Sequence, residues 1–272
     1  MTTRSKTDWL FLAPMALVAL FFVGRALLSQ AGRECAISDV TSLRVAGLVK
    51  LVFLLAGGTI ALSNAARLGR GNLIRPGWVM LGAGLLATAV GQAALCVYQF
   101  SPRGAAPFPS LADVFFFLSY PLFTAALVSF LRGYAATGYP LGTVRQRLVL
   151  GGLVGVVGLA LAIAVLHPVV FKPGVAPLAR FLNTAYPILD VVLLVPVALL
   201  LRATLPLRGG EVWKVWVALL AGFFFMWAGD VLFACFDALN MQGVDPLTHA
   251  MYVLSYGSLA LGVVRQHRLL AS

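Results

Sequence analysis

Two acidic residues of this chain lie deep inside long apolar segments, where a charged group is costly. Asp190 and Asp230 are these residues. A charged side chain at the centre of a bilayer costs about 2.5–3.5 kcal/mol on insertion scales, so it needs a partner, a wet cavity or a function. Such acids could bind a polar ligand, serve ion-coupled transport, or act as general acid and base on a lipid. The structural alternative is an ion pair or hydrogen bond between two helices.

Other polar residues share helix faces with one another at spacings of three, four or seven residues. Tyr186 precedes Asp190 by four positions, and His249 precedes Tyr256 by seven. Residues at such spacings lie on the same side of a helix. The pattern predicts a polar pocket in the outer half of a helix bundle. The predicted ligand-binding residues are Asp190, Asp230, Tyr186 and Tyr120, with Asp113, Lys50 and His249 as secondary members.

Some of these residues have a simpler interpretation. Asp113 and His249 lie within about a turn of a helix end, where they could be capping or solvated groups. Lys50, like Arg25, could extend to the outer interface through its long apolar stem. Asp190 and Asp230 are deeper, so they are the strongest members of the predicted site.

The segments that must position these residues are predicted to be membrane-spanning helices. The chain has 272 residues, 61% of them hydrophobic and 11% charged, with a mean hydropathy of +0.95. This composition excludes an ordinary soluble globular domain. Because about 20 apolar residues cross a bilayer, we expect an all-α integral membrane protein, with residues 1–272 forming a single polytopic domain. The eight predicted helices cover about 9–29, 45–65, 78–99, 110–131, 148–166, 181–201, 213–238 and 249–265.

The basic residues predict the orientation of these helices. The net charge is +11, but the basic residues lie at helix ends and form no aromatic-interleaved patch, which argues against nucleic-acid binding. Basic residues concentrate in cytoplasmic loops. We therefore expect a multi-pass protein of the bacterial inner membrane with both termini in the cytoplasm. The few basic residues of the opposite side are Arg33, Arg44, Arg103, Lys172 and Arg180.

Neither a cofactor nor a metal is predicted. Cys35, Cys96 and Cys235 form no CxxC pair and have no metal-like spacing with histidine. The first apolar segment is too long for a signal peptide and has no small-residue cleavage site, so we expect it to remain as a helix.

Short sequence matches indicate a four-plus-four internal repeat. Leu118–Tyr120 recurs as Leu254–Tyr256, and Arg44 matches Arg180, each pair separated by half the chain. An even number of helices in each half would relate the halves by an axis along the membrane normal. Chance similarity between leucine-rich helices is the alternative.

Three segments resemble the multi-helix membrane regions found at the N-terminus of bacterial GGDEF and EAL signalling proteins. They are Pro109–Leu122, Ala185–Asp190 and Gly229–Phe233. In that family the membrane region is thought to sense a signal and pass it to a cytoplasmic cyclic-di-GMP enzyme. Only residues 265–272 follow the last predicted helix here, so the resemblance implies a stand-alone sensor whose output is a separate cytoplasmic signalling protein.

A weaker resemblance is to bacterial lysoplasmalogenase-type proteins, which are also eight-helix proteins. It rests on Gly229-Asp230 followed by a His-bearing helix at His249, and it implies lipid hydrolysis. The third predicted helix carries Gly91-Gln92 and no matching Gly-Asp step, which counts against an enzyme. We therefore favour a non-enzymatic sensor that binds a small or amphipathic ligand. A lipid hydrolase and a small-solute transporter are the alternatives, and the ligand, the partner and the oligomeric state stay open.

Overall fold

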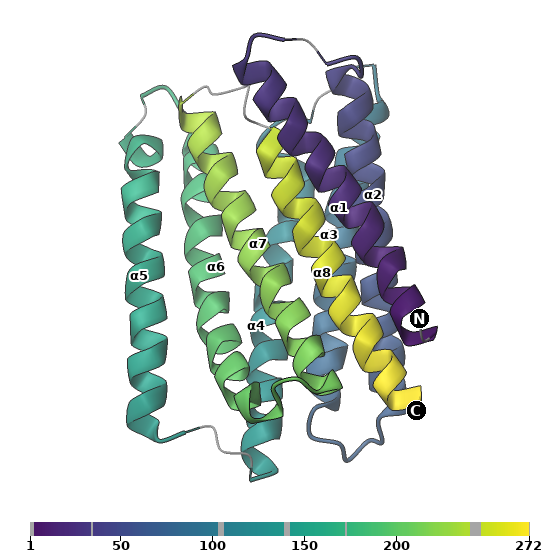
Figure 1. The fold of residues 1–272 in the computed structure, drawn as a ribbon. Helices are drawn as coiled ribbons and strands as arrows, with labels where there is room; N and C mark the ends of the chain where they lie inside the picture. The colour runs from purple at the N-terminus through teal and green to yellow at the C-terminus, as the bar shows by residue number, and fades with distance from the viewer. Residues whose placement is uncertain are drawn as a thin grey trace.

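The computed structural model describes residues 3–33, 35–102, 106–138, 142–171, 173–239 and 246–271. The predicted all-α class is confirmed, because these ranges form helices and contain no strand. Figure 1 shows the helices running side by side along one direction. They are α1 (Thr3–Gln30), α2 (Asp39–Arg67), α3 (Arg75–Phe100), α4 (Leu111–Ala136), α5 (Val144–Phe171), α6 (Pro177–Thr204), α7 (Glu211–Leu239) and α8 (Pro246–Ala271), with a short 3₁₀ turn, η1 (Leu205–Leu207), after α6.

Seven of the described helices are long and apolar enough to cross a bilayer, namely α1, α2, α3, α4, α6, α7 and α8. A helix of 26 residues, such as α4, is about 39 Å long at about 1.5 Å per residue. That exceeds the roughly 30 Å of hydrocarbon in a bilayer. The chain is therefore a multi-pass membrane protein. The remaining helix, α5, has 28 residues, and its role as an eighth span stays a prediction.

The helices that enter the predicted site begin at clear local signals. The Ser38 side chain accepts a hydrogen bond from the Thr41 amide and so caps α2. Ser110 and Asp113 form a reciprocal capping box at the start of α4. Pro177 occupies the first turn of α6, where a missing amide proton costs nothing.

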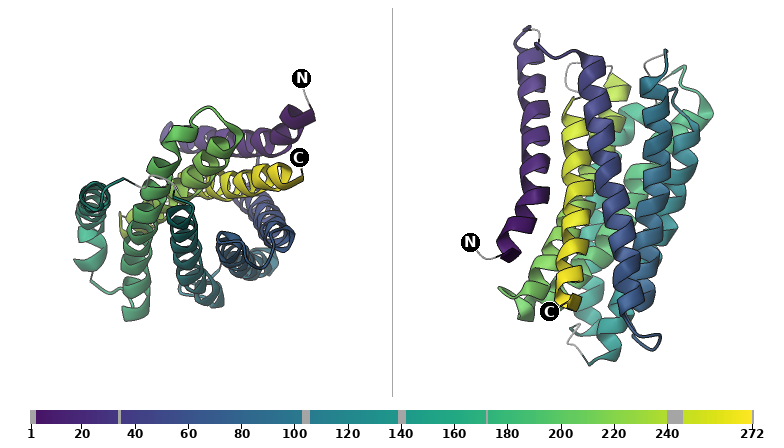
Figure 2. Two further views of the ribbon diagram at one scale, coloured as in Figure 1. Left: turned by 90° about the horizontal axis from the view of Figure 1, so that it is seen from below. Right: turned by 90° about the vertical axis from the view of Figure 1, so that its right-hand side faces the viewer.

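Helix α8 lies at the centre of the bundle. It packs against α1, α2 and α7, whereas α5 packs mainly against α6 and α7 at one side of the bundle (Figure 2). Close approach depends on glycine: a Cβ atom at Gly262 would lie 2.8 Å from Cγ of Leu219 on α7. Because α8 faces protein rather than lipid, it tolerates the lowest hydropathy of the seven candidate spans.

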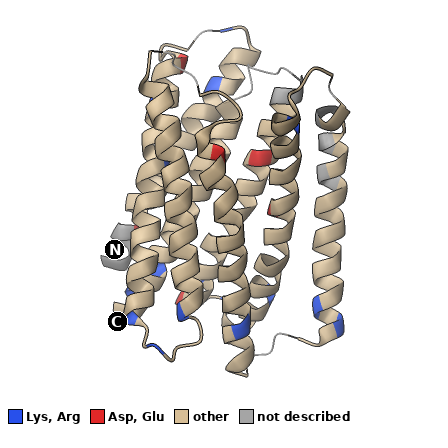
Figure 3. Ribbon diagram, turned by 180° about the vertical axis from the view of Figure 1, so that it is seen from behind, with Lys and Arg blue, Asp and Glu red and all other residues tan. Residues whose placement is uncertain are grey.

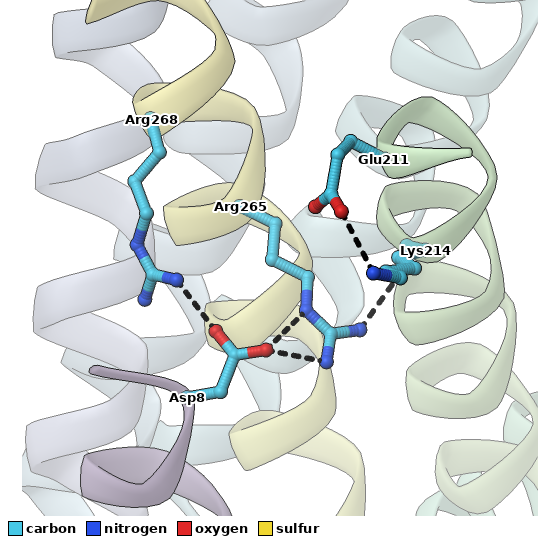
Figure 4. A network of polar contacts seen from close by, with 5 residues as sticks. All are labelled: Asp8, Glu211, Lys214, Arg265 and Arg268. Carbon is cyan, nitrogen blue, oxygen red and sulfur yellow. Dashed lines mark hydrogen bonds and ion pairs between the residues drawn. The ribbon is translucent and has the colours of Figure 1, made fainter. Parts of the chain in front are cut away.

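Both ends of the described chain lie at the same end of the bundle. Asp8 of α1 pairs with Arg265 and Arg268 of α8, at N–O distances of 2.7 and 2.6 Å (Figure 4). Arg265 also donates to the Lys214 carbonyl oxygen, so α7 joins this cluster. Lysine and arginine are more numerous at this end (Figure 3), and the orientation of the bundle in the membrane stays a prediction. Arg103 and Lys172, which belong to the opposite side in that topology, lie outside the described residues.

Candidate functional site

A cavity of about 330 Å³ lies in the half of the bundle that is opposite to the termini. Residues from α2, α3, α4, α6, α7 and α8 line it, together with the segment 106–110 between α3 and α4. Its deepest residue on α3 is Thr88, twelve residues before the helix ends, which corresponds to a depth of about 18 Å. The volume is at the lower end of the range typical of small-molecule sites, roughly 300–1,000 Å³.

Two of the predicted acids are joined by one tyrosine. The Tyr120 hydroxyl of α4 lies 3.0 Å from Oδ1 of Asp190 on α6 and 2.8 Å from Oδ2 of Asp230 on α7. The Tyr252 hydroxyl of α8 donates a further hydrogen bond to Oδ1 of Asp230. Four helices therefore meet in one polar network. Because a hydroxyl has a single proton, Tyr120 can donate to only one of the two carboxyl groups at a time.

Asp190 is not part of the cavity wall. Its side chain is 1% exposed and lies behind Tyr120, whose hydroxyl it contacts. Asp230 and Tyr120 do line the cavity. The predicted pair of acids is therefore brought together, but only Asp230 faces the cavity directly.

Asp113 both caps a helix and lines the cavity. Its Oδ2 accepts the Ser110 backbone amide at 2.7 Å, and its Oδ1 accepts the Tyr186 hydroxyl of α6 at 3.0 Å. The Tyr186 ring stacks on Tyr120, with centroids 5.9 Å apart. Asp113 therefore has both of the positions considered from the sequence: it caps α4 and it lines the cavity.

The two basic residues of the predicted site lie on helices α2 and α8. Lys50 is 3% exposed, so it is buried in the bundle rather than extended to the interface. Its ammonium group lies 5.7 Å from the centroid of the Tyr252 ring, within the range of a cation–π contact. The His249 ring packs against Phe22 of α1, with centroids 5.5 Å apart. Both Lys50 and His249 line the cavity.

Neutral polar residues complete the lining, and the pattern of charged residues did not single them out. Thr88, Gln92 and Gln99 of α3 and Thr248 of α8 are all buried and line the cavity. Thr88, Gln92 and Gln99 occur at positions i, i+4 and i+11 of an otherwise apolar helix. This spacing places them on one face and is the signal that could have revealed them.

A second cavity lies between α4 and α6 on the lipid-facing side, with a volume of about 510 Å³. Its lining includes Phe117 and Ala125, which are exposed in the isolated bundle, and Arg132 near the end of α4. Tyr120 lines both cavities. The tyrosine that joins the two acids is therefore also the wall between the polar cavity and the lipid-facing one.

No protein-family model, curated protein or solved structure matches this chain. The fold and the site define a multi-pass helical membrane protein with a buried polar cavity. Its function has to be inferred from the chemistry of that cavity.

Proposed function

We propose that this chain is a ligand-binding membrane protein of the sensor type, which takes a small or amphipathic ligand in the cavity between α2, α3, α4, α6, α7 and α8. The observation that carries the proposal is the convergence of polar side chains from all six helices, most of them buried, on one space. Each such group is costly to bury in a membrane. Helix–helix hydrogen bonds alone would need pairs of polar residues, without a cavity of about 330 Å³ between them.

The polar network supports a role in signalling. Tyr120 and Tyr252 line the cavity and hold Asp230, so a ligand that displaces either hydroxyl alters contacts among α4, α6, α7 and α8. These helices run to the end of the bundle where the basic residues gather. A ligand that binds one packing of these helices better than another shifts their equilibrium. The inner-membrane location and a separate cytoplasmic partner are parts of the same proposal, supported by the charge distribution and by the resemblance to signalling proteins.

The finer architecture that fits this proposal has eight spans in two halves of four. Several helix contacts agree with such a repeat, since α2 contacts α3 and α8 while α6 contacts α7 and α4. The outer helices differ, because α1 packs on α8 whereas α5 packs on α6 and α7. A repeat would thus involve the six helices that line the cavity.

The test of the proposal is native mass spectrometry of the protein purified in mild detergent. We expect a small molecule or lipid to co-purify with the wild-type protein and to be lost from an Asp190→Asn, Asp230→Asn double variant. Glu211→Gln is the matched control, because Glu211 is an exposed acid at the opposite end of the bundle. A spectrum without bound species for all three proteins would assign the acids to helix packing alone.

A lipid hydrolase is the second candidate. It is favoured by one observation: Asp230 and His249 line the same cavity, where an acid and an imidazole could activate water. The check is incubation of the wild-type protein with ether and ester lysolipids. Product release that disappears in His249→Ala, with the variant still folded, would establish the hydrolase. No release would leave the binding protein as the function.

A further inference from the structure

The second cavity, of about 510 Å³, is a groove along the outer surface of α4. Of the described residues that line it, all belong to α4 except Leu189 of α6. The α4 residues run from Phe117 to Arg132 along the face on which Phe117, Pro121, Ala125 and Arg132 are exposed. The groove therefore opens toward the lipid.

The sizes of the side chains give the groove its direction. Pro121, Ala125 and Ser129 follow one another at intervals of four residues, so they form one row on the surface of α4. Their side chains are short, whereas those of Phe117 and Arg132, at the two ends of the lining, are long. The groove therefore runs along the helix axis, which is also the direction of the acyl chains in a bilayer.

The length of the groove matches one leaflet. Tyr120 and Arg132 are twelve residues apart on α4, which corresponds to about 18 Å. The acyl chains of one leaflet span half of the hydrocarbon core, or about 15 Å. With α4 centred in the bilayer, about 4–5 Å of the helix extends beyond the hydrocarbon at each end. Arg132, about 6 Å before the end of α4, then lies at the level of the lipid head groups.

Arg132 gives the groove its chemical preference. Among the described residues at this end of the bundle, the acids are Asp8 and Glu211, and both are paired with other basic side chains (Figure 4). Arg132 forms no ion pair or hydrogen bond with any described residue, and its side chain is exposed. A guanidinium group binds a phosphate through two parallel hydrogen bonds. The groove therefore combines an apolar channel with a phosphate-binding group at its head-group end.

We propose that this groove binds an anionic phospholipid, with the phosphate on Arg132 and one acyl chain along α4 as far as Tyr120. Basic pockets between helices at the membrane surface bind anionic head groups. A zwitterionic phospholipid fits the channel equally well, but its positive group is repelled by the arginine, so its affinity is lower. The site lies outside the polar cavity, so it does not depend on the function proposed for that cavity.

The experiment compares two phospholipids with identical oleoyl chains, the anionic dioleoylphosphatidylglycerol and the zwitterionic dioleoylphosphatidylcholine. Native mass spectrometry of the delipidated full chain in mild detergent resolves each bound lipid during a titration. We expect the first phosphatidylglycerol to bind at least about fivefold more tightly than phosphatidylcholine, the effect of one basic residue near the head group. Arg132→Gln should remove this preference by lowering the affinity for phosphatidylglycerol alone.

A second variant tests the position of the acyl chain. Ala125→Phe places a ring in the middle of the channel and should lower the affinity for both lipids by about fivefold or more, because the chain loses apolar contact area. Arg132→Lys keeps the positive charge and should keep a preference for phosphatidylglycerol.

Matched controls separate this site from general surface effects. Arg70→Gln removes an exposed arginine at the same end of the bundle but outside the groove. Ala16→Phe adds a ring at an exposed position of α1. Neither control should change the affinity for either lipid. Size-exclusion profiles and thermal unfolding report whether each variant folds.

Three results would overturn the inference. The first is equal affinity of the wild-type protein for the two lipids. The second is an equal loss in Arg132→Gln and Arg70→Gln, which would assign the preference to the general charge of this end. The third is unchanged lipid binding in folded Ala125→Phe, because the chain would then lie elsewhere. The proposed function fails separately, since its test follows a species that is lost when Asp190 and Asp230 are replaced.

Discussion

At the scale of single residues, the Tyr120 hydroxyl is the junction of the site. It contacts carboxyl oxygens of Asp190 and Asp230, which are supplied by α6 and α7. Its ring also separates the polar cavity from the lipid-facing one. Tyr120 therefore both links the two acids and forms part of the wall of the pocket.

Tyr120→Phe tests this junction with a minimal change. The variant keeps the ring that stacks on Tyr186 and removes only the hydroxyl, so the two carboxyl groups lose their shared contact. We expect a loss of about 1–3 kcal/mol in stability, measured as a lower thermal unfolding temperature in detergent.

Tyr98→Phe is the control for this prediction, because Tyr98 lies near the end of α3 outside the cavity lining. Equal unfolding temperatures for Tyr120→Phe, Tyr98→Phe and the wild type would show that the Tyr120 hydroxyl contributes nothing to stability.

At the scale of elements, glycines decide how closely the helices approach. α8 is the most buried of the seven candidate spans, and close approach to α7 depends on Gly262 and Gly222. A Cβ atom at either position would overlap a leucine of the facing helix. The contact between α7 and α8 also brings Asp230 and Tyr252 together, so this packing is what assembles one side of the site.

Gly262→Val should separate α7 from α8. The added Cβ would lie 2.8 Å from the Leu219 side chain and 3.2 Å from its backbone nitrogen, so the helices have to shift. Overpacking of this kind costs about 1–3 kcal/mol. We expect a lower thermal unfolding temperature and weaker binding of the ligand that co-purifies with the wild type.

The matched substitution for this test is Gly24→Val on α1, where nothing lies within 4 Å of an added Cβ atom. Its unfolding temperature should stay at the wild-type value. If both valine variants have the same lowered unfolding temperature, the effect is due to valine in a helix and not to the α7–α8 contact.

At the scale of the whole molecule, charge is distributed between the two ends of the bundle. The end with both termini contains the cluster of Asp8, Arg265 and Arg268, and the polar cavity lies toward the other end. A cluster of this type fixes the first helix to the last. The cavity, which begins at the other end, is separated from the termini by about half the length of the helices.

The topology prediction belongs to this scale. Because basic residues remain on the cytoplasmic side, tags placed at the N-terminus and at the C-terminus should both be protease-accessible in inside-out membrane vesicles. Both should be protected in right-side-out vesicles. Opposite accessibility of the two tags would contradict an even number of spans, since α1 and α8 would then end on different sides.

The sequence by itself determined the class of protein, the approximate helices and the polar residues that matter. A membrane forces every backbone group into local hydrogen bonds, so apolar segments of sufficient length predict helices without knowledge of their neighbours. The cost of buried charge likewise marks Asp190, Asp230 and Lys50 directly in the sequence. For this reason the structure gathers all seven predicted site residues around one cavity, six of them in its lining.

Only the tertiary structure decided how those residues are paired. Hydropathy does not encode the rotation of a helix about its axis or the order in which helices pack, because lipid and apolar protein surfaces are nearly equivalent surroundings for leucine. The placement of Tyr120 between two acids and the close approach of the Gln99 side chain to Gly47 depend on that packing. Neutral amides carry a smaller burial cost than charges, so the search for costly charges in the sequence did not single them out.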